Sequence, residues 1–184
     1  MRTPSGNKVY GMGAEFPSAA ALYEAAKRVR DAGFKRWDVH SPFPIHGMDA
    51  AMGLGKSWLS AFVLAGGITG LLTAVTLEFG PSWIIYPLVV HGKPVDWRTV
   101  PAFFPIMFEL TVLFSAFTAF FAMLLMNGLP RWYHPVFNWR RFSRATNDGF
   151  FLIIEARDPR FTEVEARELL EQSGGTHVTV IHED

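Results

Sequence analysis

The sequence contains no cysteine among its 184 residues. This absence excludes disulfide bonds, thiolate-held iron–sulfur clusters, cysteine-ligated zinc and covalently attached c-type haem. Net charge is also absent, because 17 basic residues balance 17 acidic ones, so the chain has no bulk attraction to nucleic acid. We therefore expect no metal, no cofactor and no nucleic-acid partner bound by this chain itself.

Histidine is missing from the long apolar segments. A membrane helix that holds b-type haem places histidines inside the span, and none of the six lies there: His40, His46, His91, His134, His177 and His182. We expect His91 and His134 on opposite sides of the membrane, so they form no axial pair. All six are interpreted as connector or surface residues, with a structural or functional contact left open for His46.

Two long apolar stretches, residues 58–77 and 104–125, dominate the middle of the chain. The first carries no charge, and the second carries a single ionisable side chain, Glu109. About 20 apolar residues in a helix span the roughly 30 Å hydrocarbon core of a bilayer. Buried helices of a soluble domain would show a polar face, and these stretches do not. The pattern predicts two transmembrane helices that form a hairpin.

The basic residues predict how this hairpin is oriented. Lysine and arginine number eight before the first stretch, two between the stretches and seven after the second. The positive-inside rule then places both termini in the cytoplasm and the loop 78–103 outside. The first thirty residues contain no apolar run, so we expect the amino terminus to start in the cytoplasm. Five tryptophans flank the spans as expected interfacial anchors: Trp58, Trp83, Trp97, Trp132 and Trp139.

The polar ends of the chain, residues 1–40 and 149–184, share one pattern of strand, helix and strand. Ser18 and Thr162 stand where each helix begins, and Gly33 follows the first helix. Each half is too small to bury a core alone. We expect the halves to combine into one split ferredoxin-like domain (βαβ–βαβ) with the hairpin inserted between its second and third strands. The fold class is thus an α+β membrane protein. The alternative is that each βαβ piece packs on a partner subunit.

Two connectors, residues 41–57 and 126–148, join this cytoplasmic domain to the hairpin. Two prolines and a glycine within residues 41–49 oppose regular structure, so the first connector is expected to lie along the membrane surface.

Two further patterns in the polar ends have ordinary explanations. Gly11 and Gly13 begin a dinucleotide fingerprint, but Phe16 replaces its third glycine, so a tight turn is expected instead. A group of acidic residues near the carboxyl end is expected to form a solvated face: Asp158, Glu163, Glu165, Glu168 and Glu171.

The second stretch contains the candidate for proton chemistry. An acidic side chain inside a span is costly and normally faces protein or a water-filled cavity. Glu109, followed by Thr111 and Ser115, gives a thin polar path through phenylalanines. We interpret these three residues as a proton-path candidate. The alternative is that Glu109 hydrogen-bonds a neighbouring helix and fixes packing.

The first stretch contains a packing motif. Gly66, Gly70 and Ala74 recur every four residues, and small residues at this spacing allow another backbone to approach closely. The motif predicts helix association without identifying the partner.

Several segments of this sequence resemble one family: Phe43–Asp49 (FPIHGMD), Tyr86–Pro87 with Gly92–Pro94, Pro101–Pro105 (PAFFP) and Phe108–Thr111 (FELT). The chain resembles the ActD subunits of alternative complex III, a bacterial quinol:electron-acceptor oxidoreductase. This resemblance implies a non-catalytic accessory subunit of the bacterial cytoplasmic membrane that braces multi-span quinol-binding subunits. It also implies haem c, iron–sulfur clusters and quinol in the partner subunits, which include cytochrome c and iron–sulfur proteins.

Other classes of function fit the residues less well. A membrane-anchored sensor of a small ligand, or an interaction module, should offer a polar pocket or an output domain, and the sequence indicates neither. A channel would need an oligomer with Glu109 as its polar constriction, and the phenylalanines of the second stretch oppose a water-filled lumen. An enzyme is not expected, because no nucleophile–base pair, metal-ligand cluster or phosphate-binding motif is recognisable.

Overall fold

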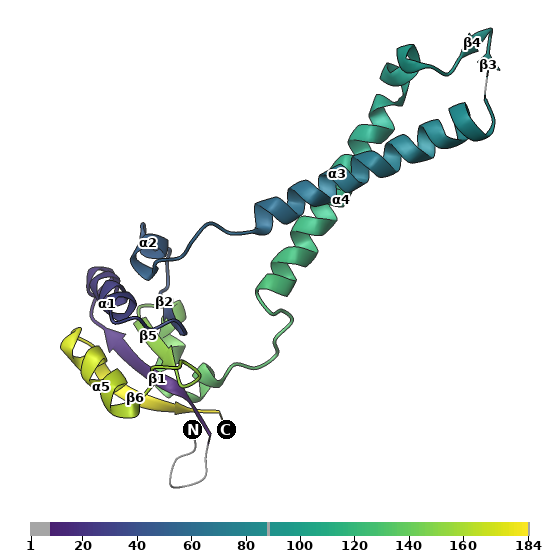
Figure 1. Ribbon diagram of the computed structural model, residues 1–184. Helices are drawn as coiled ribbons and strands as arrows, with labels where there is room; N and C mark the ends of the chain where they lie inside the picture. Colours follow the sequence, from purple (N-terminus) through teal and green to yellow (C-terminus); the bar gives the residue numbers. More distant parts are fainter. Residues whose placement is uncertain (1–7, 88, 184) are drawn as a thin grey trace. The chain divides into compact units, whose positions relative to one another are not determined.

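The computed structural model describes residues 8–87 and 89–183 of the chain, which divide into two compact units. One unit combines the chain up to Gly55 with the chain from Trp132 onward, and the other runs from Lys56 to Arg131. Figure 1 shows that the helices labelled α3 and α4 belong to the second unit and that all strands of the main sheet belong to the first.

The first unit is built on a four-stranded antiparallel sheet that takes two strands from each end of the chain. The strands are β1 (Val9–Phe16), β2 (Trp37–His40), β5 (Phe150–Glu155) and β6 (Thr176–His182). They lie in the order β2-β5-β1-β6, and Met12 of β1 stands opposite Ile154 of β5 and Val180 of β6. Because β1 lies between two strands that follow the hairpin in sequence, the two halves share one sheet.

Two helices, α1 (Ala19–Asp31) and α5 (Glu163–Gln172), cover one face of this sheet (Figure 1). Both begin where the sequence predicts, since the hydroxyls of Ser18 and Thr162 accept hydrogen bonds from backbone N–H groups of the first turn. Apolar side chains between the helices and the sheet form the larger core, which includes Met12, Ala14, Leu22, Val29, Leu152, Ile154 and Leu170.

The opposite face of the sheet is covered by the segment expected to be a simple connector. Two 3₁₀ helices, η3 (Pro135–Asn138) and η4 (Arg140–Thr146), pack there. Four buried residues of this segment recur every third position: Val136 of η3, Trp139 between the two helices, and Phe142 and Ala145 of η4. A 3₁₀ helix has three residues per turn, so within η4 this spacing puts Phe142 and Ala145 on one side. Val136 and Trp139, on either side of the extended break before η4, join them in the same buried cluster. Residues 126–148 therefore contribute a layer of the core.

Burial of Trp139 corrects one expectation drawn from the tryptophans. Its side chain is 7% exposed and packs edge-on against Phe151, so it is a core residue of the first unit and no interfacial anchor. Trp58, Trp83, Trp97 and Trp132 are exposed, and Trp132 retains 96% of its accessible surface.

The expectation of a tight turn at Gly11 and Gly13 is wrong, because both glycines lie inside β1. A Cβ atom on Gly13 would lie 2.7 Å from the Trp139 ring, and one on Gly11 would lie 2.3 Å from the carbonyl oxygen of Ile154. Only glycine allows the 3₁₀ layer and the neighbouring strand to approach β1 this closely.

The first connector contains one short regular element, α2 (Met48–Met52), after the irregular segment that its prolines produce. Met48 and Ala51 of α2 are buried in the larger core beside α1. This part of the connector therefore belongs to the domain.

The second unit consists of α3 (Leu59–Phe79), which continues as the π-helical segment η1 (Gly80–Ile85), and α4 (Val100–Met126). Both helices are long and apolar enough to cross a membrane by length and composition. Between them lie the short strands β3 (Val89–Val90) and β4 (Lys93–Pro94) and the 3₁₀ turn η2 (Trp97–Thr99). The helices extend beyond the stretches 58–77 and 104–125, because helical structure continues past the uninterrupted apolar runs at both ends of the loop.

Candidate functional site

The helix-packing motif lies at the contact between α3 and α4. A Cβ atom on Gly70 would lie 2.3 Å from the carbonyl oxygen of Leu110, and one on Gly66 would lie 2.2 Å from the Thr118 hydroxyl. Ala74, on the same side of α3, is completely buried. The small residues therefore let α4 of the same chain approach closely.

Thr111 and Ser115 of the proton-path candidate lie on this same contact. A Cβ atom on Gly67 would lie 2.7 Å from Ser115 Oγ and 3.7 Å from a methyl carbon of Thr111. Each hydroxyl donates to the carbonyl oxygen one turn earlier, Thr111 to Met107 at 2.6 Å and Ser115 to Thr111 at 2.8 Å. Their protons thus satisfy backbone acceptors inside the hairpin.

Glu109 occupies a different position on α4. Its side chain is exposed on the surface of the hairpin, whereas Thr111 and Ser115 are partly buried against α3. The structure therefore brings the two hydroxyls together but places the carboxylate outside, where lipid, water or another subunit would meet it.

An acidic residue that the sequence analysis missed, Glu78, is buried in the hairpin. It retains 7% of its accessible surface, and neither carboxylate oxygen has a hydrogen-bond partner among the described residues. The signal that could have found it is its spacing, since Glu78 follows Ala74 by four residues and continues the line of Gly66 and Gly70.

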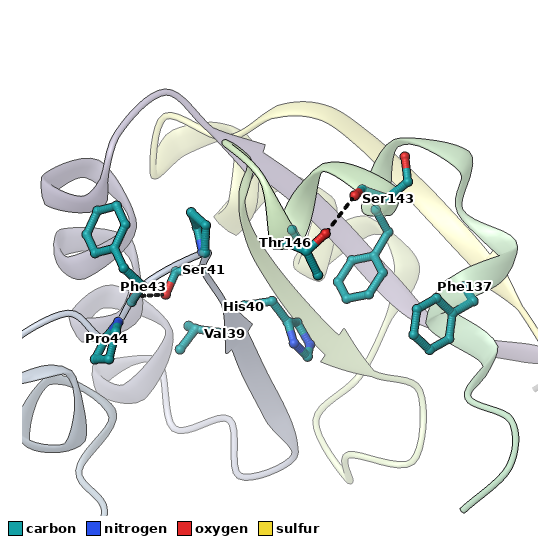
Figure 2. A pocket seen from close by; sticks show the side chains of 11 residues that line it. Val39, His40, Ser41, Phe43, Pro44, Phe137, Ser143 and Thr146 are labelled. Carbon is teal, nitrogen blue, oxygen red and sulfur yellow. Dashed lines mark hydrogen bonds between the residues drawn. The ribbon is translucent and has the colours of Figure 1, made fainter.

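A groove of about 670 Å³ opens in the first unit, between the chain that follows β2 and the 3₁₀ helices (Figure 2). Its walls carry the imidazole of His40 and the hydroxyls of Ser41, Ser143 and Thr146 among apolar side chains. All three hydroxyls already donate to backbone carbonyls: Ser41 to Phe43 at 2.7 Å, Ser143 to Arg140 at 3.0 Å and Thr146 to Ser143 at 3.4 Å. The groove combines a partly apolar floor with polar groups.

His40 is the titratable group of this groove. Its ring packs edge-on against Phe142, with 4.9 Å between ring centroids. Burial lowers the pKa of His40 from its ordinary value, and the opposing charge of Asp38 does not reverse this effect. His40 is therefore neutral at pH 7, with one ring nitrogen able to accept a hydrogen bond and the other to donate one.

His46, the connector residue singled out in the sequence, lies in an exposed turn directly before α2. The following Gly47 has a φ of 80° and adopts the left-handed conformation. The turn places the His46 side chain at the surface of the first unit and away from the groove lining.

An ion cluster fixes the 3₁₀ layer to the sheet. The buried carboxylate of Glu15 in β1 accepts hydrogen bonds from Arg141 Nε at 2.8 Å and from Arg144 Nη1 at 2.7 Å. Arg144 also pairs with Asp148, and this hydrogen bond holds the pKa of Asp148 below its ordinary value. Two of the arginines counted for membrane orientation thus also stabilise the domain.

Asp158 corrects part of the expectation of a solvated acidic face. It is 5% exposed and lies before α5, not on it. Its Oδ2 accepts from the backbone N–H groups of Lys35 at 2.6 Å and Arg36 at 2.7 Å, and its Oδ1 accepts from that of Arg160 at 2.8 Å. Burial opposes its ionisation, but these donors outweigh burial and hold the pKa of Asp158 below its ordinary value.

Comparison with known proteins identifies the family. The chain matches the family described as "Alternative complex III, ActD subunit" over residues 10–180. No curated protein matches it. A subunit of alternative complex III works beside other subunits in a hetero-oligomeric electron-transport complex of the respiratory chain. With nearly its whole length matched, this chain belongs to the ActD family of alternative complex III subunits.

Proposed function

We propose that this chain is an accessory subunit that braces the multi-span subunits of alternative complex III and performs no redox chemistry itself. The observation that carries the proposal is the apolar surface of the hairpin. No residue of α4 is buried within the chain, although the helix has 27 mostly apolar residues. Such a surface needs lipid or other membrane helices around it.

A groove beside the helix contact supports this bracing role. It has a volume of about 620 Å³ and is lined by mostly apolar residues of α3 together with Thr111 and Ser115 of α4. A helix of a neighbouring subunit would fit this groove and cover the exposed Leu64, Ile68 and Leu71. The bound partners would then be the multi-span quinol-binding subunits.

The proposal includes the location of both units. Spans α3 and α4 would cross the bacterial cytoplasmic membrane, with both termini in the cytoplasm and the loop between the helices outside, as the distribution of basic residues favours. The first unit would be a ferredoxin-like domain split by the hairpin, a proposal supported by its antiparallel order β2-β5-β1-β6 and its two helices on one face.

The redox groups of the complex are proposed to lie in partner subunits. Haem c and iron–sulfur clusters need cysteine ligands or attachment sites, which this sequence lacks. We expect cytochrome c, iron–sulfur and quinol-binding subunits to carry these groups.

Purification of the tagged chain from native membranes in mild detergent tests this function. We expect the eluate to show the reduced-minus-oxidised spectrum of haem c and to contain multi-span and iron–sulfur proteins by mass spectrometry. A colourless preparation that contains this chain alone would contradict the accessory role.

We further propose that Glu109, with Thr111 and Ser115, contributes to proton movement through the complex. Exposure of the Glu109 carboxylate on the hairpin surface supports a contact with a neighbouring subunit or with water between subunits. We expect Glu109→Gln to assemble normally and to lower the proton yield per quinol oxidised, measured in vesicles that contain the complex. Glu168→Gln, on the exposed surface of the last helix, is the matched control. Full quinol turnover with full proton movement in the Glu109 variant would exclude the role.

A second candidate function, a membrane-anchored sensor or interaction module, is favoured by one observation: the groove beside His40. A small polar ligand, or a loop of another protein, would find hydrogen-bonding groups and apolar surface together there. Ser143→Trp would fill the groove without altering the hairpin. Loss of complex assembly or of quinol turnover in this variant would support a contact at the groove, and unchanged behaviour would exclude one needed for either.

A further inference from the structure

Glu78 lies on the inner side of the α3–α4 hairpin. It continues the line of Gly70, which contacts α4, and Ala74, which is completely buried. The next residue, Phe79, packs against Phe103 near the start of α4, with 4.9 Å between ring centroids. Since the helices are antiparallel and Gly70 meets Leu110, this register places Glu78 beside the first turns of α4.

The carboxyl group of Glu78 is enclosed but unsatisfied. Both oxygens are buried, and neither accepts a hydrogen bond from residues 8–87 or 89–183. Side chains of α4 and η1 pack on this part of α3, and together these two elements contain one ionisable residue, Glu109, which points outward. No hydrogen-bond donor among the described residues therefore reaches the carboxyl group of Glu78.

A buried group of this kind is stable when it is neutral. An ionised carboxylate without a partner in an apolar environment costs far more free energy than the protonated acid, which carries no net charge. An acidic residue inside an apolar helix hairpin indicates a functional site, because leucine or alanine would pack there at a lower cost in free energy.

We propose that Glu78 is a proton-binding site of this subunit, whose ligand is a single proton held on the carboxyl group inside the hairpin. Binding transfers a proton from a hydronium ion to the carboxylate: one O–H bond of the hydronium breaks, leaving water, and one O–H bond forms on Glu78. The proposal is independent of Glu109, which lies on the outer surface of the hairpin.

Infrared spectroscopy of the purified complex tests this proposal directly. The wild-type spectrum minus that of Glu78→Gln at pH 7 should contain the carbonyl stretch of one protonated carboxylic acid, which shifts in heavy water. Glu168→Gln, which removes an exposed carboxylate, should give the two stretches of an ionised carboxylate instead. If the Glu78 difference spectrum matches that control, Glu78 is ionised, and the proposal is wrong.

Chemical labelling of the wild-type complex keeps the proposal testable if the Glu78 variant does not assemble. Dicyclohexylcarbodiimide reacts with protonated carboxyl groups in apolar surroundings. We expect it to modify Glu78 in native membranes, as located by mass spectrometry, and to modify it less as the pH is raised. If Glu78 is unmodified while other intramembrane carboxyl groups of the complex react, the proposal is overturned. Such a result would indicate an ion pair with an arginine or lysine of a neighbouring subunit.

Discussion

Asp158 links two segments that are far apart in the sequence. Its carboxylate accepts hydrogen bonds from the backbone N–H groups of Lys35 and Arg36, which precede it by 123 and 122 residues. These donors precede β2, whereas Asp158 follows β5, so the carboxylate connects the halves of the split domain. The sequence misled here because an acidic residue near an acidic helix resembles a solvated one. Every residue except proline has a backbone N–H group, so the residue types do not show which groups Asp158 binds. This contact could therefore not be predicted from the sequence.

We expect Asp158→Asn to lower the free energy of unfolding of the full chain by about 1–3 kcal/mol at pH 7, because a charged acceptor of three N–H groups is lost. Denaturant unfolding in detergent measures the change. Asp148→Asn, which loses one exposed ion pair, is the control and should lose less. An equal loss in both variants would contradict the role of Asp158.

The pH dependence follows from the sign of the same pKa shift. The pKa of Asp158 is lower in the folded chain than its ordinary value, so its stabilisation is complete above about pH 4 and is lost as the pH falls through the folded pKa. The stability difference between the wild type and Asp158→Asn should therefore shrink on acidification.

Regular elements could be predicted well where one rule governed them. The apolar residues Leu22, Ala25, Ala26 and Val29 have the spacing of one helix face, and all four are fully buried in α1. The last helix is less regular, since it buries Ala166 and Leu170 but leaves Val164 69% exposed. The 3₁₀ layer was missed because a period of three was not considered, although Val136, Trp139, Phe142 and Ala145 follow it without interruption.

At the contact between α3 and α4, we expect Gly70→Ala to weaken the hairpin. The added Cβ would lie 2.3 Å from the carbonyl oxygen of Leu110. Because this oxygen belongs to the backbone, it cannot move aside as a flexible side chain can, so the helices must separate. Gly80→Ala is the matched control, because nothing lies within 4 Å of its added Cβ. Thermal stability of the chain in detergent and the yield of assembled complex measure both variants. The contact would be unimportant if the two variants behaved alike.

On the scale of the whole molecule, the division between polar ends and apolar centre could be predicted from composition. Hydropathy alone indicated two long helices, and the repeated pattern of strand, helix and strand indicated that the ends belong together. The burial of Glu78 could not be predicted in this way, because it depends on the register of two helices. The same holds for the groove beside His40, which is formed by segments about 100 residues apart.

The proposed orientation can be tested because the chain has no cysteine, so each introduced thiol is the single one in this subunit. Lys93→Cys places a thiol in the loop between α3 and α4, and Glu168→Cys places one on α5; both positions are exposed. A membrane-impermeant maleimide should label Lys93→Cys in intact spheroplasts and Glu168→Cys only after permeabilisation. The opposite pattern would show that the positive-inside rule fails for this chain.

The place of β1 in the sheet has a consequence for biosynthesis. This strand is translated before its hydrogen-bonding neighbours β5 and β6, which follow both long helices in the sequence. Until then, an apolar strand with two open edges is exposed to chaperones and proteases. Under the proposed orientation, we expect the sheet to be completed only after the hairpin has been inserted and the chain has returned to the side of the ribosome. A nascent chain stalled in the translocon would keep its first half unfolded and open to degradation.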